Sequence, residues 1–340
     1  RKKVRSGGIM KRRVACFLVA ATALAMTATA IEAPLPRHPA PSPDGSRIAF
    51  SWQGDLWLVS AKGGQASRLT AHPAVERFPV WSRDGSSIAF ASDRHGNFDV
   101  FVMPVDRSAP PARLTFASTN DRPECFSPEG ESVLFTSQRY AGVSRGLQLW
   151  TVSLSGGTPA ILQDAFARNA AYSPDGETLA FVRGGTPWTR RGYRGSGSRD
   201  LWLRTPDGHY TQLTDFEGDD DYPSWIDNTT IAFLSARNGR KNVFRIDTAT
   251  GEATKLTSHE GSAVRFPRAS ADGSVIAYEF EDRLWTVTPG GGDPTRLSIQ
   301  VPADETKNPV QRKTSSDAAD DLAVSPDGKL AAFIVYGDVF

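Results

Sequence analysis

The sequence predicts an all-β fold, a six-bladed β-propeller made of four-stranded antiparallel blades. Three observations predict it: a turn tetrapeptide that recurs, an apolar triplet that follows it each time, and spacings of 40 to 55 residues between successive triplets. Each period holds four short apolar runs joined by turns. A single four-stranded sheet leaves its faces open and must stack on neighbours, and repeats of this length with four strands are typical of propellers.

The recurring turn has the form Ser-x-Asp/Glu-Gly. Asp-Gly or Glu-Gly between apolar runs is a strong hairpin signal. We interpret the Asp residues as turn formers rather than calcium ligands, because an Asp side chain can hydrogen-bond the backbone two residues further on. The copies begin at Ser42, Ser82, Ser127, Ser173, Ser270 and Ser325, and "WIDN" at 225–228 takes the same place in one further copy.

The other strands of each copy also follow a pattern. The apolar triplet, such as Ile48-Ala49-Phe50, is the expected second strand. A third strand resembles Asp55-Leu56-Trp57, and a fourth resembles Arg68-Leu69-Thr70. Gly pairs between the third and fourth strands supply the positive φ that tight hairpins need.

The copies divide the chain into four parts. Residues 31–300 hold six complete copies and form the expected propeller, and the polar, turn-rich stretch 301–320 is the expected linker. Residues 321–340 begin a seventh copy, which we interpret as the truncated start of a second propeller. A seven-bladed ring with an incomplete last blade remains the alternative.

Residues 1–30 comprise nine upstream residues and a predicted signal peptide. Met10 is followed by three basic residues, the apolar run "VACFLVAATALAM" and the small-residue exit Ala28-Thr29-Ala30. This order is that of a secretory signal peptide, so we expect a periplasmic or secreted protein, with an uncleaved anchor as the alternative. The single cysteine after this segment, Cys125, permits neither an intrachain disulfide nor a zinc site.

Charge argues against a nucleic-acid-binding protein. The chain has 39 basic and 38 acidic residues, but seven basic and no acidic ones lie in residues 1–30, which leaves 32 against 38 in the remainder. A nucleic-acid-binding domain needs a basic body, and this body is acidic. We expect no nucleic-acid partner and no cofactor.

Catalytic and metal-binding patterns are weak. Ser144 lies in a G-x-S-x-G pentapeptide, but a strand follows it where a nucleophile elbow requires a helix, so we expect a loop and no catalytic residue. The five histidines share no metal-ligand spacing, and we expect loop hydrogen bonds from His72 and His259. No metal site is predicted.

An insertion at 183–200, "RGGTPWTRRGYRGSGSRD", lengthens the fourth spacing to 52 residues. Arginine can hold a carboxylate through two hydrogen bonds, and aromatic rings pack against apolar side chains, so this insertion is the candidate peptide-binding segment. The acidic loop "FEGDDDY" at 216–222 would attract amines or neutralise these arginines. The alternative is a solvated loop or a docking surface for another domain. The candidate peptide-binding residues are Trp188, Arg190, Arg191, Tyr193 and Arg194.

The ordered blades and this insertion resemble the N-terminal half of the tricorn protease family. The stretch from "GDLWLVSAKGG" at 54–64 is similar to its first two blades, and "YRGSGSRDLWLR" at 193–204 is similar to the start of its fourth. The resemblance implies a large serine peptidase whose catalytic residues lie beyond residue 340, so this segment itself would bind or gate peptides without catalysis. Implied partners are peptides or unfolded polypeptide, the C-terminal domains of the same protein, and a second copy of the chain.

Two other functions stay open. One is a stand-alone periplasmic scaffold of the Tol type, and the other is the propeller cap of a dipeptidyl-peptidase-like hydrolase. Both families also use propellers, and the repeat alone does not separate them.

Overall fold

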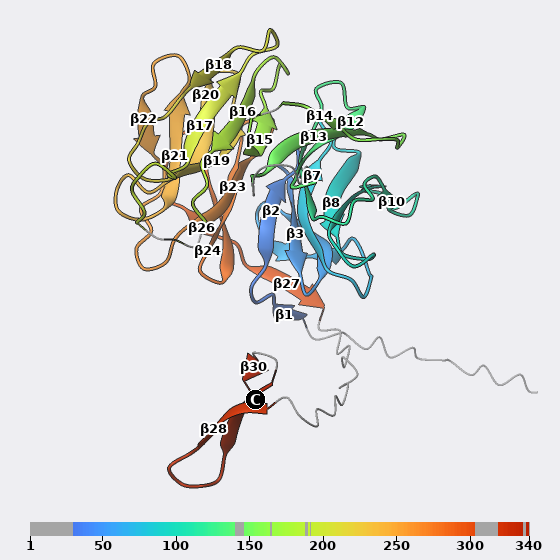
Figure 1. Ribbon diagram of the computed structural model, residues 1–340, viewed down its shortest axis with the longest axis vertical. Coiled ribbons are helices and arrows are strands. Elements are labelled where there is room, and N and C mark those ends of the chain that lie inside the picture. Colours follow the sequence, from blue (N-terminus) through green and yellow to red (C-terminus); the bar gives the residue numbers. More distant parts are fainter. Residues whose placement is uncertain are drawn as a thin grey trace, which may run out of the picture. The chain divides into compact units, whose positions relative to one another are not determined.

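The computed structural model describes residues 30–139, 146–163, 165–187, 190, 192–302, 319–335 and 338–339. These residues form strands, turns and connections, without a helix, and hence without any helix that could cross a membrane. The strands assemble into six four-stranded antiparallel sheets and two three-stranded ones (Figure 1). The predicted all-β fold is confirmed.

Each four-stranded sheet is one blade, built from consecutive strands in chain order with β5 (Gly64–Gln65) left outside. Blade 1 consists of β2 (Arg37–Pro41), β3 (Arg47–Trp52), β4 (Asp55–Ser60) and β6 (Ser67–Arg68). Blade 2 consists of β7 (Glu76–Trp81), β8 (Ser87–Ser92), β9 (Asp99–Pro104) and β10 (Ala112–Arg113). Blade 3 consists of β11 (Asp121–Phe126), β12 (Ser132–Ser137), β13 (Gln148–Ser153) and β14 (Ala160–Ile161). Blade 4 consists of β15 (Arg168–Tyr172), β16 (Leu179–Arg183), β17 (Asp200–Arg204) and β18 (Tyr210–Gln212). Blade 5 consists of β19 (Asp220–Trp225), β20 (Thr230–Ser235), β21 (Asn242–Asp247) and β22 (Ala253–Lys255). Blade 6 consists of β23 (Arg265–Ala269), β24 (Ile276–Phe280), β25 (Arg283–Val287) and β26 (Thr295–Arg296).

The first strands of the blades contact one another in cyclic order. Around the ring, each inner strand contacts the next in the order β2, β7, β11, β15, β19 and β23, and β23 contacts β2. The six blades therefore close on themselves within residues 37–296, and the six-bladed ring is the one that the structure shows.

The apolar triplets fill the space between blades. Phe50, Phe90 and Phe135, each the last residue of its triplet, are fully buried. Each core combines two adjacent blades: Val80 and Val100 of blade 2, for example, pack with Phe126 and Val133 of blade 3. Removing a phenylalanine from such a core costs about 3–5 kcal/mol, so the triplet contributes strongly to the stability of each blade.

The Ser-x-Asp-Gly segments are turns, as predicted. In the first copy the Ser42 hydroxyl donates to Asp44 Oδ1, the Ser46 amide donates to the same oxygen, and Gly45 adopts a φ of +64°. These hydrogen bonds lower the pKa of Asp44 to about 2. The same serine-to-aspartate hydrogen bond recurs in the turns that begin at Ser82, Ser173, Ser270 and Ser325.

The third and fourth strands are joined by a second repeated arrangement. Asp55 accepts hydrogen bonds from the Arg68 guanidinium, and the Thr70 hydroxyl accepts the Leu56 amide at 2.9 Å. Blade 2 repeats this with Asp99, Arg113 and Thr115. The "DLW" and "RLT" patterns are therefore two halves of one contact.

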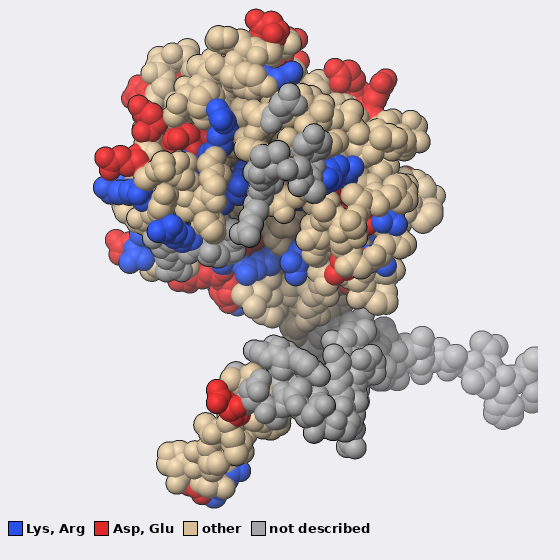
Figure 2. All heavy atoms as spheres, viewed as in Figure 1, with Lys and Arg blue, Asp and Glu red and all other residues tan. Residues whose placement is uncertain are grey.

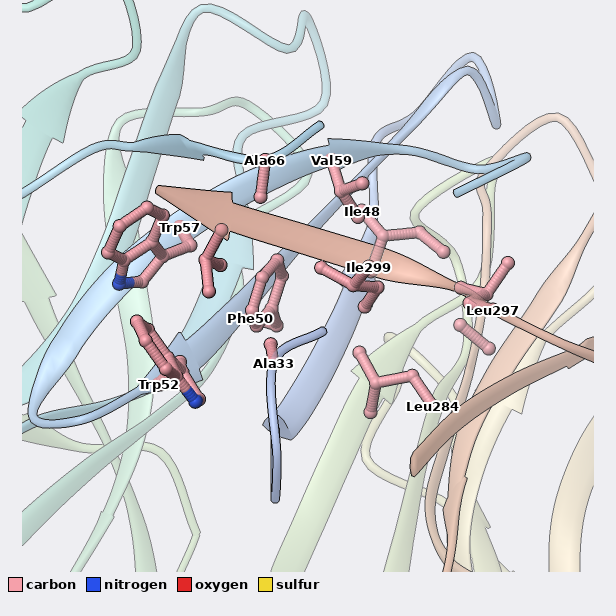
Figure 3. Close-up of a cluster of buried hydrophobic side chains, with 12 residues drawn as sticks. Ala33, Ile48, Phe50, Trp52, Trp57, Val59, Ala66, Leu284, Leu297 and Ile299 are labelled. Atoms are coloured by element: carbon pink, nitrogen blue, oxygen red, sulfur yellow. The ribbon is translucent and has the colours of Figure 1, made fainter. Parts of the chain in front are cut away.

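Residues near the two ends of the ring pair with each other, which the sequence did not predict. Strand β1 (Ala30–Glu32) lies antiparallel to β27 (Ile299–Pro302), and β27 lies parallel to β5. Ile299 and Val301 of β27 are buried against Phe50 of blade 1 and Leu284 of blade 6 (Figure 3). This sheet covers the junction between the last blade and the first.

The chain divides into two compact units, Thr29–Pro302 and the remaining residues. In the second unit, β28 (Ala319–Val324), β29 (Ala331–Val335) and β30 (Asp338–Val339) form an antiparallel sheet with the same Ser-x-Asp-Gly turn. Most of the predicted linker, and all of the predicted signal peptide except Ala30, lie outside the described residues.

Candidate functional site

Each inner strand of the ring is interrupted by a β-bulge. In β2, Arg37 pairs with Ser51 and Ala40 with Ala49, so His38 and Pro39 are left out of the regular ladder. The bulged residue adopts a left-handed conformation in five blades, at a cost on the order of 1–2 kcal/mol each. These residues are His38 (φ 52°), Phe78 (56°), Asn169 (49°), Tyr222 (53°) and Phe266 (49°).

The bulges bring aromatic rings together at the centre of the ring. The His38 imidazole lies 4.1 Å from the Phe78 ring and 5.0 Å from Phe266, measured between centroids. Tyr222 lies 5.1 Å from Phe266. Arg122 of blade 3 places its guanidinium 4.4 Å from the Phe78 ring and 5.6 Å from that of Tyr222. Side chains from five blades thus meet at one level of the channel.

The residue five positions before the Ser-x-Asp/Glu-Gly turn is an arginine in five of the six blades: Arg37, Arg77, Arg122, Arg168 and Arg265. Their nearest acidic groups are fewer and buried. Glu279 pairs with Arg37 at 2.8 Å and with Arg265 at 3.4 Å, and Glu124 lies 3.8 Å from Arg122. We call these residues, together with the aromatic rings above, the central cluster.

Burial and the arginines together set the protonation of His38. Its pKa is lowered well below the ordinary value, first by burial and then by the positive charge of Arg122. The imidazole is therefore neutral at physiological pH, and its buried Nδ1 has no hydrogen-bond partner among the described residues.

Three cavities surround the central cluster. The largest of them, about 460 Å³, lies between blades 5 and 6 and is lined by Tyr193, Tyr222, Leu234, Val264 and Phe266, among others. Smaller ones of about 290 and 320 Å³ include His38 and Arg122 respectively. In Figure 2, Lys and Arg side chains lie both toward the middle of the propeller and at its left edge, whereas most Asp and Glu side chains lie toward the edge.

The insertion approaches this centre from blade 4. Buried Arg199 holds its base: the guanidinium donates to the Thr186 carbonyl at 2.8 Å and forms an ion pair with Asp221, next to Tyr222. The first residues of the inner strands and the loops between second and third strands lie at the same edge of each blade. We call this side of the ring the insertion face.

The structure separates the candidate peptide-binding residues. Tyr193 lines the 460 Å³ cavity, and the Arg190 guanidinium stacks on its ring at 4.3 Å. Arg194 instead pairs at 3.3 Å with Glu217 of the acidic loop, and both side chains are exposed. Trp188 and Arg191 lie outside the described residues. Nothing in the structure tests peptide contact by this set, which stays a prediction.

Sequence reasoning missed the central cluster, although a signal was present. "RHP", "RFP" and "RFP" at 37–39, 77–79 and 265–267 stand at the same distance before the Ser-x-Asp-Gly turn. An arginine, a ring and a proline at one repeat position mark side chains that converge on the ring axis, because every blade contributes its inner strand there.

The remaining sequence candidates have structural roles where they are described. His72 Nδ1 accepts the Ala74 amide at 3.0 Å, and His259 Nε2 lies 2.8 Å from the Tyr278 hydroxyl, so both make the expected loop contacts. Within the described ranges no group of three or more His, Cys, Asp or Glu side chains could hold a metal ion. Ser144 lies outside the described residues.

The closed ring of six four-stranded blades, with converging side chains on its axis, defines a six-bladed β-propeller. The model of the tricorn protease N-terminal β-propeller domain matches residues 34–293, and the chain belongs to this family.

Individual relatives agree. The tricorn protease homolog 1 of Streptomyces coelicolor is 30% identical over 268 residues, which cover 77% of this chain and 24% of the relative. The crystal structure of the tricorn protease superposes with a TM-score of 0.71 at 20% identity, over 91% of this chain and 30% of that one. TolB from Acinetobacter baumannii has a TM-score of 0.54 at 20% identity, over 68% of this chain and 56% of its own. The chain spans about a quarter of the length of the tricorn homologues it matches.

Proposed function

We propose that this propeller binds peptide segments on its insertion face, as the N-terminal part of a longer tricorn-like serine peptidase. The observation that carries the proposal is the central cluster with its adjoining cavity, where aromatic rings and arginines from several blades face one space. Aromatic rings pack against apolar side chains, and arginines donate hydrogen bonds to carboxylates and carbonyl oxygens. An extended polypeptide carries apolar side chains, carboxylates and carbonyl oxygens.

The expected ligand is an unfolded segment rather than a folded partner. The cavity between blades 5 and 6, about 460 Å³, has room for a few side chains, and pockets of this size are typical of small ligands. A folded protein would instead need a surface of about 800 Å² on each side.

Fluorescence polarisation tests this proposal with the full 340-residue chain and labelled peptides from a denatured, alkylated protein. We expect saturable binding that weakens at least fivefold when Arg190, Tyr193 and Arg194 are all changed to alanine. The matched control carries Arg107→Ala and Tyr210→Ala, an exposed arginine and tyrosine outside the insertion. Equal loss in both variants, or tight binding of a folded partner in place of peptides, would favour a scaffold of the Tol type.

We propose that peptide hydrolysis belongs to a domain outside these 340 residues. The purified chain should then hydrolyse none of the labelled peptides over many hours. Turnover that disappears with Ser144→Ala would contradict this, because it would make Ser144 a nucleophile.

We also propose that the protein is exported, from the order of charges and apolar residues before Ile31. Cell fractionation of a bacterium expressing the chain, followed by N-terminal sequencing, should find a soluble product that begins at Ile31. An intact N-terminus in the membrane fraction would instead indicate an uncleaved anchor.

A further inference from the structure

The 460 Å³ cavity on the insertion face is built by three blades. Tyr193 comes from the blade 4 insertion, Tyr222 and Leu234 from blade 5, and Val264 and Phe266 from the segment that enters blade 6. We call it the Tyr193 cavity. No single blade could assemble it, because its lining residues lie up to more than 70 residues apart in the chain.

The walls of this cavity are apolar and aromatic. Leu234 and Val264 are buried members of the core between blades 5 and 6. Tyr222 and Phe266 meet edge to face, with their ring centroids 5.1 Å apart. Two rings in this arrangement present both a face and an edge, and a third ring gains about 0.5–1.5 kcal/mol beyond simple burial from such contacts.

Tyr193 is held at the opening of the cavity by its own loop. The amide of Gly197 donates to the Tyr193 hydroxyl at 3.3 Å, and a side chain at Gly195 would come within 3.0 Å of the same oxygen. Glycine at this position leaves room for the ring to lie back over its own loop. The third aromatic wall is thus positioned before any ligand arrives.

The charges around the cavity are unequal. Lys241 is neutralised by Asp219 at 3.1 Å, and both side chains are largely buried. Arg265 has Glu279 at 3.4 Å. Arg240 is exposed, and its guanidinium donates to the carbonyl of Gly261 without a carboxylate partner among the described residues. The Arg240 guanidinium therefore adds to the lining of the cavity a positive charge that no described carboxylate matches.

We infer that the Tyr193 cavity binds an aromatic side chain of a peptide, and that Arg240 selects an acidic residue beside it. This inference rests on the proposed peptide binding and specifies its ligand class. A phenylalanine or tryptophan ring buries against Tyr193, Tyr222 and Phe266, and a neighbouring aspartate or glutamate reaches the Arg240 guanidinium at the rim. A basic neighbour is repelled by the same guanidinium.

Short labelled peptides test both halves of the inference. Each is glycine-rich, carries its label at the N-terminus and ends in an amide. In the peptides that contain aspartate, its side chain is therefore the only carboxylate besides the label. The set contains Phe beside Asp, Phe beside Lys, and Ala beside Asp. We expect the first to bind the full chain at least tenfold more tightly than either of the other two.

Two variants locate the binding. Ala236→Phe and, separately, Ala263→Phe place a ring inside the cavity, and each should weaken the Phe–Asp peptide at least tenfold. The matched control is Ala249→Phe, an exposed alanine in the turn after β21. Melting temperatures identify a variant that fails to fold. If one of the two cavity-filling variants fails, the other decides whether the peptide binds in the cavity.

Arg240→Glu tests whether Arg240 selects the residue next to phenylalanine. The expected result is a reversed preference between two peptides, which an unfolded variant would not show. The substitution should reverse the preference, so that the Phe–Lys peptide binds more tightly than the Phe–Asp peptide. Lys62→Glu, an exposed charge reversal in another blade, should leave the preference unchanged.

The outcomes separate this inference from the proposed function. If peptides bind but ignore both cavity-filling variants, peptide binding stands and the Tyr193 cavity is not the site. If no peptide binds but N-acetyl-phenylalaninamide quenches tyrosine fluorescence in a way that Ala236→Phe abolishes, the aromatic site stands and the peptide function falls. Equal binding of the Phe and Ala peptides overturns the inference.

Discussion

At the scale of single residues, one replacement in the repeat changes the chemistry of a carboxylate. In blades 1 and 2 the aspartate that begins the third strand pairs with an arginine of the fourth strand. In blade 4 the same aspartate is Asp200, and Gln212, opposite Trp202, takes the place of the arginine. The Gln212 side-chain amide donates to the Thr214 carbonyl. Burial, and then the negative charge of Asp220, raises the pKa of Asp200 to about 6.

This raised pKa predicts a pH dependence of stability. Between about pH 4 and 6 the folded protein holds a proton on Asp200 that the unfolded chain has released, so stability falls as the pH rises through this window. Gln212→Arg supplies the missing counter-charge and should raise the melting temperature at pH 7.5 by about 2–4 °C, roughly 1 kcal/mol for a domain of this size.

Thermal melts at pH 7.5 and pH 4 check this prediction. The gain should vanish at pH 4, where Asp200 is protonated in both variants. Thr211→Arg, on the neighbouring exposed position of β18, is the control and should give no pH-dependent gain. A gain that is the same at both pH values would contradict the assignment to Asp200.

At the scale of elements, an ion pair between one buried acidic side chain and one arginine joins the first two strands in each of three blades. Asp220 of β19 accepts from Arg237 at 2.7 Å, and the Arg237 guanidinium stacks on Phe233 and Phe244. Glu76 with Arg94 and Asp121 with Arg139 repeat the arrangement in blades 2 and 3. The arginine follows the second strand by two residues and returns to the first, so it ties the start of the inner strand to its neighbour.

Removing this arginine should be costly because the acid stays buried. Arg237→Ala leaves Asp220, which is fully buried, without a counter-charge, and should reduce the free energy of unfolding by about 3–5 kcal/mol near pH 7.5. Burial already raises the pKa of Asp220, so protonation relieves the variant and its loss should shrink at pH 5.

Urea denaturation at the two pH values measures the effect. Asp220→Asn in the Arg237→Ala background should restore part of the stability, and Arg107→Ala, an exposed arginine, should change little. A loss that neither pH nor the second substitution alters would exclude the buried carboxylate as its cause.

At the scale of the whole molecule, the ring is closed by a sheet that no blade contains. Strand β27, after blade 6, lies between β1, before blade 1, and β5, which follows β4 in the chain but lies outside the blade 1 sheet. Its side chains Ile299 and Val301 are buried with residues of both terminal blades (Figure 3). A closed ring has no exposed sheet edge at the junction, which protects it from pairing with other chains.

Closure should therefore depend on β27. Ile299→Ala should lower the free energy of unfolding by about 2–5 kcal/mol, as for other fully buried aliphatic residues. Ile161→Ala, in the outermost strand β14 and 39% exposed, is the control and should cost much less. Equal losses in urea denaturation would show that the sheet contributes no more than a surface strand.

The sequence by itself determined the fold class, the number of complete blades and the role of the Ser-x-Asp-Gly turn. These features depend on contacts between residues close in the chain, and six copies repeat the same evidence. The "DLW" and "RLT" patterns were visible too, although the hydrogen bonds that join Asp55 to Arg68 were not.

Only the tertiary structure decided which side chains share the ring axis and which strand closes the ring. The central cluster joins residues such as His38, Arg122 and Phe266, which lie far apart in the chain and meet because six bulged inner strands converge. The pairing of β1 with β27 spans nearly the whole propeller. A local pattern carries no information on such pairings, because closing the ring fixes them all at once.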